Sequence, residues 1–126
     1  MAAGLELSMS QLRALHVLDD TDRPLALHEL AGRMGLSVAA TGRAVDVLVR
    51  GGLLSRREDE ADRRVKRIAI TEAGRDAVNR LVAARREGLA RFVSTLSEEE
   101  RDTLSAALAP ILARPELQLA CKEVSR

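Results

Sequence analysis

Arginine and carboxylate side chains concentrate between Ser37 and Arg67, and they are the residues of this 126-residue chain best suited to chemistry. The segment holds eight Arg or Lys and five Asp or Glu, whereas the rest of the chain holds 12 and 14. A net charge of +1 therefore conceals a local excess of positive charge. Because guanidinium groups bind phosphate oxygens through paired hydrogen bonds, the segment predicts a few placed phosphate contacts rather than bulk electrostatic wrapping.

The sequence offers few residues for a disulfide, a metal site or a catalytic site. Cys121 is the single cysteine, which excludes an internal disulfide and a multi-thiolate zinc site, and its place in the C-terminal tail does not favour a redox switch. His16 and His28 cannot complete a metal site without carboxylates from elsewhere in the chain. No nucleophile has an adjacent base, and no glycine-rich loop could cradle a phosphate. We therefore expect no catalysis, no metal and no cofactor.

Composition excludes two further classes. Phe92 is the only aromatic residue, so a single-strand binder that stacks bases and an aromatic-lined ligand pocket are both disfavoured.

The sequence also shows no signal for membrane insertion or secretion. No apolar run approaches the roughly 18 residues of a membrane helix. The first seven residues lack the charged start and apolar stretch of a secretory signal. We expect a cytoplasmic protein that makes no membrane contact.

Caps and periodicity predict the elements that position the basic segment. Ser8 and Gln11 have capping-box spacing, Gly35 is suited to a left-handed helix stop, and Ser37 is suited to cap the helix that follows. Helices are expected over residues 8–18, 28–34, 38–50 and 72–96, with a last one that begins after Ser97 and kinks or ends at Pro110. Residues 53–57 and 65–70 read as two strands joined by a charged tip, which makes a β-hairpin.

Helix, short turn, helix and charged hairpin form the winged helix-turn-helix pattern. We expect a mostly α fold with a small β-hairpin wing. A DNA-binding domain would cover residues 8–74, helices for dimerisation 75–114 and a tail 115–126. The third helix would protrude from the domain and enter a major groove.

The chain resembles the multiple-antibiotic-resistance regulator (MarR) family over roughly residues 8–114. The residues that carry the resemblance are Leu30-Ala31, Leu36-Ser37, Arg43, Val45-Asp46, Leu48, Gly52-Leu53, Arg57 and the string Asp62-Arg63-Arg64-Val65-Lys66-Arg67-Ile68-Ala69-Ile70-Thr71-Glu72-Ala73-Gly74. The string is similar to the wing signature of the family. The resemblance implies that Arg64 reaches a minor groove from the wing tip, that Asp62 holds its guanidinium, and that Thr71 and Gly74 serve the junction to the next helix.

Ten residues are candidates for DNA contact. They are Ser37, Val38, Ala39, Thr41 and Arg43 on the third helix, and Arg56, Arg57, Asp62, Arg63 and Arg64 on the hairpin. Hydrogen-bonded readout would rest on Thr41 and Arg43, with methyl contacts from Val38 or Ala39. One of Arg56 and Arg57 would face a phosphate and the other the base of the wing.

Four of these candidates also have a simpler interpretation. Asp62 and Arg64 could be a solvated hairpin pair, Arg43 a surface arginine, and Ser37 chiefly a helix cap. Gly42 costs a helix about 1 kcal/mol relative to Ala, and either allows close approach to DNA or is merely tolerated. Because the third helix is poor in hydrogen-bonding side chains, we expect sequence preference to depend on the wing and on DNA shape.

The resemblance implies a homodimeric transcriptional regulator, usually a repressor, that reads a pseudo-palindrome in double-stranded DNA. A small-molecule effector is a further candidate partner. Relatives usually carry a long helix ahead of the one expected at Ser8, where this chain has seven residues. Either that helix is absent, or the start is set late, or dimerisation rests on the last two helices. The alternative function is a winged helix that has lost DNA binding and serves as a protein-interaction module.

Overall fold

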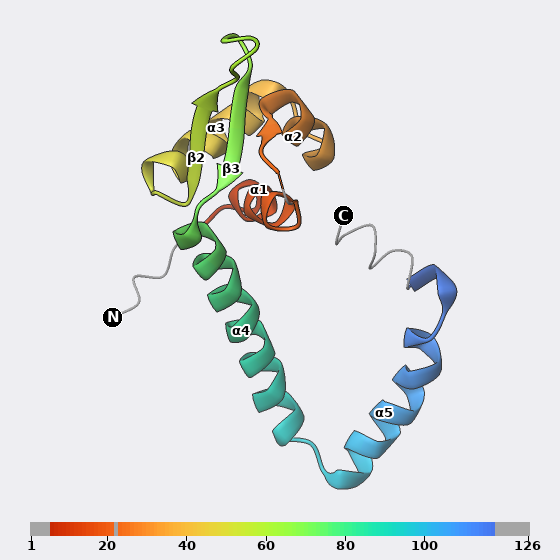
Figure 1. Cartoon of the computed structure of the whole chain (residues 1–126). Coiled ribbons are helices and arrows are strands. Elements are labelled where there is room, and N and C mark those ends of the chain that lie inside the picture. Colours follow the sequence, from red (N-terminus) through yellow and green to blue (C-terminus); the bar gives the residue numbers. More distant parts are fainter. Residues whose placement is uncertain (1–5, 22, 118–126) are drawn as a thin grey trace. The chain divides into compact units, whose positions relative to one another are not determined.

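The computed structural model describes residues 6–21 and 23–117 (Figure 1). Its elements in chain order are α1 (Met9–Asp19), β1 (Leu25–Ala26), α2 (Leu27–Met34), α3 (Val38–Arg50), β2 (Leu54–Glu58), β3 (Lys66–Ile70), α4 (Glu72–Ser94) and α5 (Glu98–Leu112). The chain forms two compact units, Met1–Asn79 and Arg80–Arg126, and the division falls inside α4. Cys121 and most of the expected tail lie outside the described residues. Among those described, no helix is long and apolar enough to cross a membrane.

The predicted caps account for the helix ends in the first unit. Ser8 and Gln11 form the reciprocal capping box of α1. Gly35 ends α2 in the left-handed conformation, with φ of 65°, which a residue with a Cβ adopts only at a cost. Ser37 accepts a hydrogen bond from the amide of Ala40 at 3.1 Å and so caps α3. The turn between α2 and α3 is therefore set by local chemistry.

The wing is a three-stranded antiparallel sheet with the order β1-β3-β2. The two longer strands are the predicted hairpin. The short strand β1 was not predicted, because two residues are too few to show alternation. Leu25 lies opposite Ile68 in the pairing, and both side chains are fully buried. This third strand covers one edge of the hairpin and attaches it to the start of α2.

The hydrophobic core lies entirely in the first unit. Its largest buried side chains come from α1, α2, α3 and the three strands: Leu15, Leu18, Leu25, Leu30, Met34, Val45, Leu48, Leu54 and Ile68. All are aliphatic or Met, as the near-absence of aromatic residues requires. Since each element contributes to one core, α2, α3 and the sheet are held in a fixed mutual arrangement.

Thr71 and Gly74 form the junction between the sheet and α4. The Thr71 hydroxyl donates to the carbonyl of Gly52 at 2.7 Å and accepts from the amide of Gly74 at 3.1 Å. A Cβ on Gly74 would lie 2.2 Å from the carbonyl oxygen of Leu53. Only glycine allows this approach, so the expected role of both residues at the junction is confirmed.

The second unit consists of the end of α4 and all of α5. Ser97 and Glu100 form the predicted capping box at the start of α5. Pro110 lies inside that helix, which continues to Leu112, so the helix does not end at the proline. No side chain in residues 80–117 is buried within the chain.

Candidate nucleic-acid interface

Helix α3 has one buried face and one exposed face. Thr41, Ala44, Val45 and Leu48 are buried against the rest of the first unit. The exposed face carries side chains spaced at one and two helical turns: Ala39, Arg43, Asp46 and Arg50. Packing of the buried face therefore fixes which side of α3 is presented to a partner.

Thr41 does not belong to the exposed face, and its predicted role in base readout is wrong. The side chain is fully buried. Its hydroxyl donates to the carbonyl of Ser37 at 2.9 Å. The spacing of 41, 45 and 48 places Thr41 on the same helical stripe as two core residues, and a hydroxyl satisfied within the helix can be buried there at little cost.

The first turn of α3 offers apolar groups instead. Val38 is 50% exposed, and Ala39 is also exposed, as expected for methyl contacts. Ser37 is exposed, but its hydroxyl caps the helix. A Cβ on Gly42 would meet only Leu27, at 3.8 Å, so packing in the free protein does not require a glycine at this position.

Arg43 and Arg50 are the exposed cations of α3. Arg43 has no ion-pair partner within the described ranges. Arg50 donates from Nε to the backbone carbonyl of Asp46 at 3.4 Å. The Asp46 carboxylate, in turn, pairs with the guanidinium of Arg56 on β2. Arg56 therefore lies against α3 rather than within the hairpin loop.

Asp62 and Arg64 form a closed pair in the loop between β2 and β3, at the end of the hairpin away from α4 (Figure 1). The Arg64 guanidinium donates to both carboxylate oxygens of Asp62, at 3.1 and 3.3 Å, and the Arg64 amide donates at 3.1 Å. These bonds, the side-chain ones first, hold the pKa of Asp62 below its ordinary value. The Arg64 side chain nevertheless stays 90% exposed. The expected orienting contact is present, with the cation still accessible.

The other two hairpin candidates are exposed cations. Arg63 follows Asp62 in the loop. Arg57 lies opposite Arg67 in the β2–β3 register. Neither Arg57 nor Arg63 has an ion-pair partner in the described part of the chain. Arg56 is thus the member of the pair that contacts another element, and the expected phosphate contact of the other arginine stays a prediction.

A network of ion pairs that the sequence pattern did not predict lies at the base of the loop. Arg67 donates from Nε to Asp59 at 2.9 Å, and its Nη1 lies 3.6 Å from a carboxylate oxygen of Glu29 on α2. Asp59 also accepts from the amides of Ala61 and Asp62, both at 3.1 Å. The bond from Arg67, followed by those amides, lowers the pKa of Asp59.

Glu29 is the second anchor of that network. Its carboxylate binds the guanidinium of Arg23 at 3.1 Å and the amide of Ala26 at 2.9 Å. The bond from Arg23, then that from Ala26, and the charge of Arg67 lower the pKa of Glu29 to about 2. The position of Glu29 in the first turn of α2 was the available sequence signal. Its partners, up to 38 residues away, could not be inferred without the fold.

Comparison with known proteins decides the family. The sequence pattern that defines the MarR family matches residues 4–65. The structure of RV1404 from Mycobacterium tuberculosis is 34% identical to this chain, with a TM-score of 0.69, over 85% of this chain and 72% of that one. A MarR-family transcriptional regulator from Silicibacter pomeroyi is 29% identical, with a TM-score of 0.57, over 85% and 71%.

The chain belongs to the MarR family of transcriptional regulators. The chain is also similar in structure to a mutant of MepR, a MarR-family protein from S. aureus, bound to an oligodeoxyribonucleotide. That structure is 27% identical, with a TM-score of 0.70, over 84% of this chain and 78% of that one. The expected winged helix-turn-helix fold of the MarR family is confirmed.

Proposed function

We propose that this MarR-family chain is a sequence-specific reader of double-stranded DNA that represses transcription. The observation that carries the proposal is the exposed arginine set of the first unit. Arg43 lies on the exposed face of α3, which packing against the core of the first unit fixes. Arg63 and Arg64 lie in the loop between β2 and β3, where Asp59 and Asp62 hold the backbone. Guanidinium groups on an exposed helix face and on a hairpin loop match the major and minor grooves of a duplex.

Each element has its own role in this proposal. Arg43 binds a guanine edge or a phosphate from α3, while Val38 and Ala39 contact thymine methyl groups. Arg64, held by Asp62, enters the narrow minor groove beside the helix, where the negative potential is strongest. Arg57 and Arg63 bind the flanking phosphates and set the register of the complex.

We propose further that the functional species is a homodimer formed through the second unit. Residues 80–117 bury no side chain within the chain. Large apolar side chains are exposed there, including Leu89 at 64% and Phe92 at 58%. Helices with no buried face are marginal in water, so they need a partner surface.

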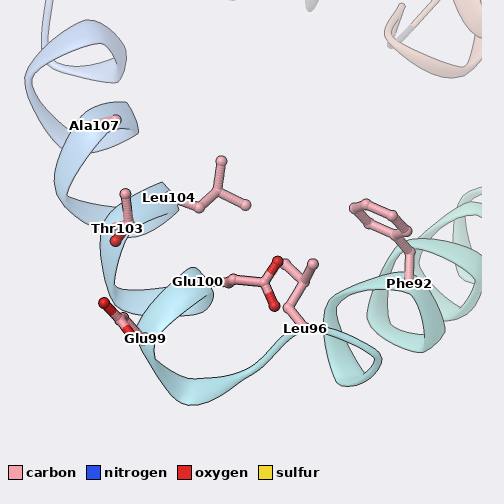
Figure 2. Close-up of a pocket in the computed structure, with 7 residues that line it drawn as sticks. All are labelled: Phe92, Leu96, Glu99, Glu100, Thr103, Leu104 and Ala107. Carbon is pink, nitrogen blue, oxygen red and sulfur yellow. The ribbon is translucent and has the colours of Figure 1, made fainter.

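The second unit contains a hollow between the end of α4 and α5. This hollow of about 560 Å³ is lined by Phe92, Leu96, Glu99, Glu100, Thr103, Leu104 and Ala107. Figure 2 shows Phe92 and Leu104 pointing toward one another from its two sides. We assign this surface to a second copy, because α4 carries an excess of Arg and the first turn of α5 is acidic. Two copies can thus offer each other opposite charges around an apolar centre.

Sedimentation of the full chain tests the dimer. Phe92→Asp and Leu104→Glu should each give a monomer, because they place an unpaired charge in the apolar surface. Val47→Asp, an exposed apolar residue of α3, should leave the dimer intact. A wild-type monomer at micromolar concentration would exclude the assignment, and binding of a small molecule without association would assign the hollow to an effector instead.

Salt dependence tests DNA binding against the alternative, a protein-interaction module. A DNA reader loses affinity with salt at a log–log slope of about −0.9 for each phosphate neutralised. Arg57→Ala and Arg63→Ala should therefore each flatten the slope by about one phosphate contact. No retention of the wild type on duplex DNA at low salt would favour the protein-interaction module.

A further inference from the structure

The proposed DNA-facing surface contains one carboxylate whose role is not explained by folding. Asp46 lies at the middle of the exposed face of α3, one turn from Arg43 and from Arg50. Its side chain is 52% exposed. A negative charge at that position opposes the phosphates of any duplex that approaches α3.

The partner of Asp46 is the guanidinium of Arg56 on β2. Arg56 lies opposite the buried Ile68 in the β2–β3 register, so its side chain leaves the sheet on the side of the core. From there it passes over α3 and ends at Asp46, with 34% of the side chain exposed. A shallow hollow lined by Asp46, Val49, Arg50 and Arg56 adjoins the pair.

An exposed ion pair of this kind contributes little to stability, on the order of 0–1 kcal/mol. The core under α3 is complete without it, since Val45 and Leu48 already anchor the helix. The pair does change the charge that α3 and β2 present. The Asp46 carboxylate offsets the charge of Arg56, and one guanidinium nitrogen of Arg56 donates to that carboxylate.

We infer that Asp46 is a positioning and specificity-determining residue, which acts by holding Arg56 away from the DNA backbone. This inference rests on the proposed DNA binding. Holding Arg56 removes one sequence-independent phosphate contact and so weakens binding to random DNA. The exposed carboxylate also remains an acceptor, which suits an amino group on a base edge such as that of cytosine. Both effects widen the difference between cognate and random sites.

The test compares wild type, Asp46→Asn, Arg56→Gln and the double variant on a selected site and on a random duplex, each across a salt series. Asp46→Asn should raise the affinity for random DNA several-fold and steepen the salt slope by about 0.9. The ratio of specific to random affinity should fall. In the Arg56→Gln background, Asp46→Asn should leave the salt slope unchanged, because there is no guanidinium to release.

Asp20→Asn is the matched control. It removes an equal charge from an exposed aspartate in the turn after α1, and it should change neither the slope nor the ratio. Equal unfolding midpoints would show that all variants are folded. Unchanged or weaker random binding by Asp46→Asn would overturn the inference, as would an equal slope change with and without Arg56. Failure of the wild type to bind any duplex would instead overturn the proposed function.

Discussion

Arg67 on β3 donates from Nε to the carboxylate of Asp59 at a distance of 2.9 Å, across the base of the wing loop. The same guanidinium reaches Glu29 on α2. Asp59 itself binds two amides of the loop. Arg67 thus connects the loop of the wing to helix α2 of the helix-turn-helix.

Loss of that side chain should affect the loop more than the core. We expect Arg67→Met to reduce the free energy of unfolding by about 1 kcal/mol, because its ion pairs are partly exposed. The amides of residues 60–64 should exchange hydrogen faster, and DNA affinity should fall. Hydrogen exchange checks this directly. Unchanged exchange in the loop would show that Arg67 does not hold the wing.

Acid should remove the contribution of Glu29 to stability. The pKa of this carboxyl is lowered from 4.5 to about 2 in the folded chain, so the folded state favours the ionised form. Its contribution is complete above pH 4.5 and is lost as the pH falls toward 2. The difference in unfolding midpoint between wild type and Glu29→Gln should therefore be largest near neutral pH and shrink over that range. A difference independent of pH would contradict the assignment.

Gly74→Ala should be among the most disruptive single-methyl changes in the chain. Its Cβ would meet the backbone carbonyl of Leu53 at 2.2 Å, which a side-chain rearrangement cannot relieve. We expect a loss of about 2–3 kcal/mol, measured by denaturant unfolding. Gly32→Ala in α2 is the control, since nothing lies within 4 Å of its Cβ, and it should be neutral or stabilising. Equal effects at the two glycines would refute the close-approach argument.

Gly42→Ala separates the two interpretations of that glycine. The added methyl makes an ordinary contact with Leu27 at 3.8 Å, so the variant should gain about 1 kcal/mol of stability from helix propensity. If α3 approaches DNA closely at this point, the more stable variant should bind its site more weakly. Unchanged affinity would mean that the glycine is merely tolerated.

Local signals predicted most of the framework. Capping residues such as Ser8, Ser37 and Ser97 form hydrogen bonds within one helical turn, and Gly35 ends a helix through its own backbone conformation. These effects can therefore be predicted from the sequence. The contact between Asp62 and Arg64 was instead implied by the resemblance to the wing signature of the MarR family.

Features that depend on packing were missed or misassigned. Thr41 was assigned to the DNA face because its residue type suits base contact. It is buried instead, because it lies on the face of α3 that packs against the core. Asp46 and Arg56 lie ten residues apart on different elements, and Glu29 meets Arg67 only because β1 brings α2 to the sheet. Such contacts depend on tertiary structure, which no local pattern encodes.

The most direct test of the central claim is selection of bound sites from random duplex DNA by the wild-type chain, repeated with Arg64→Ala and Arg43→Ala. We expect a two-fold symmetric motif with half-sites about one helical turn apart. Arg64→Ala should lose preference at the flanking A·T-rich positions, and Arg43→Ala should relax preference within the half-site. Absence of any enriched motif from the wild-type selection, or the same motif from all three chains, would contradict this expectation.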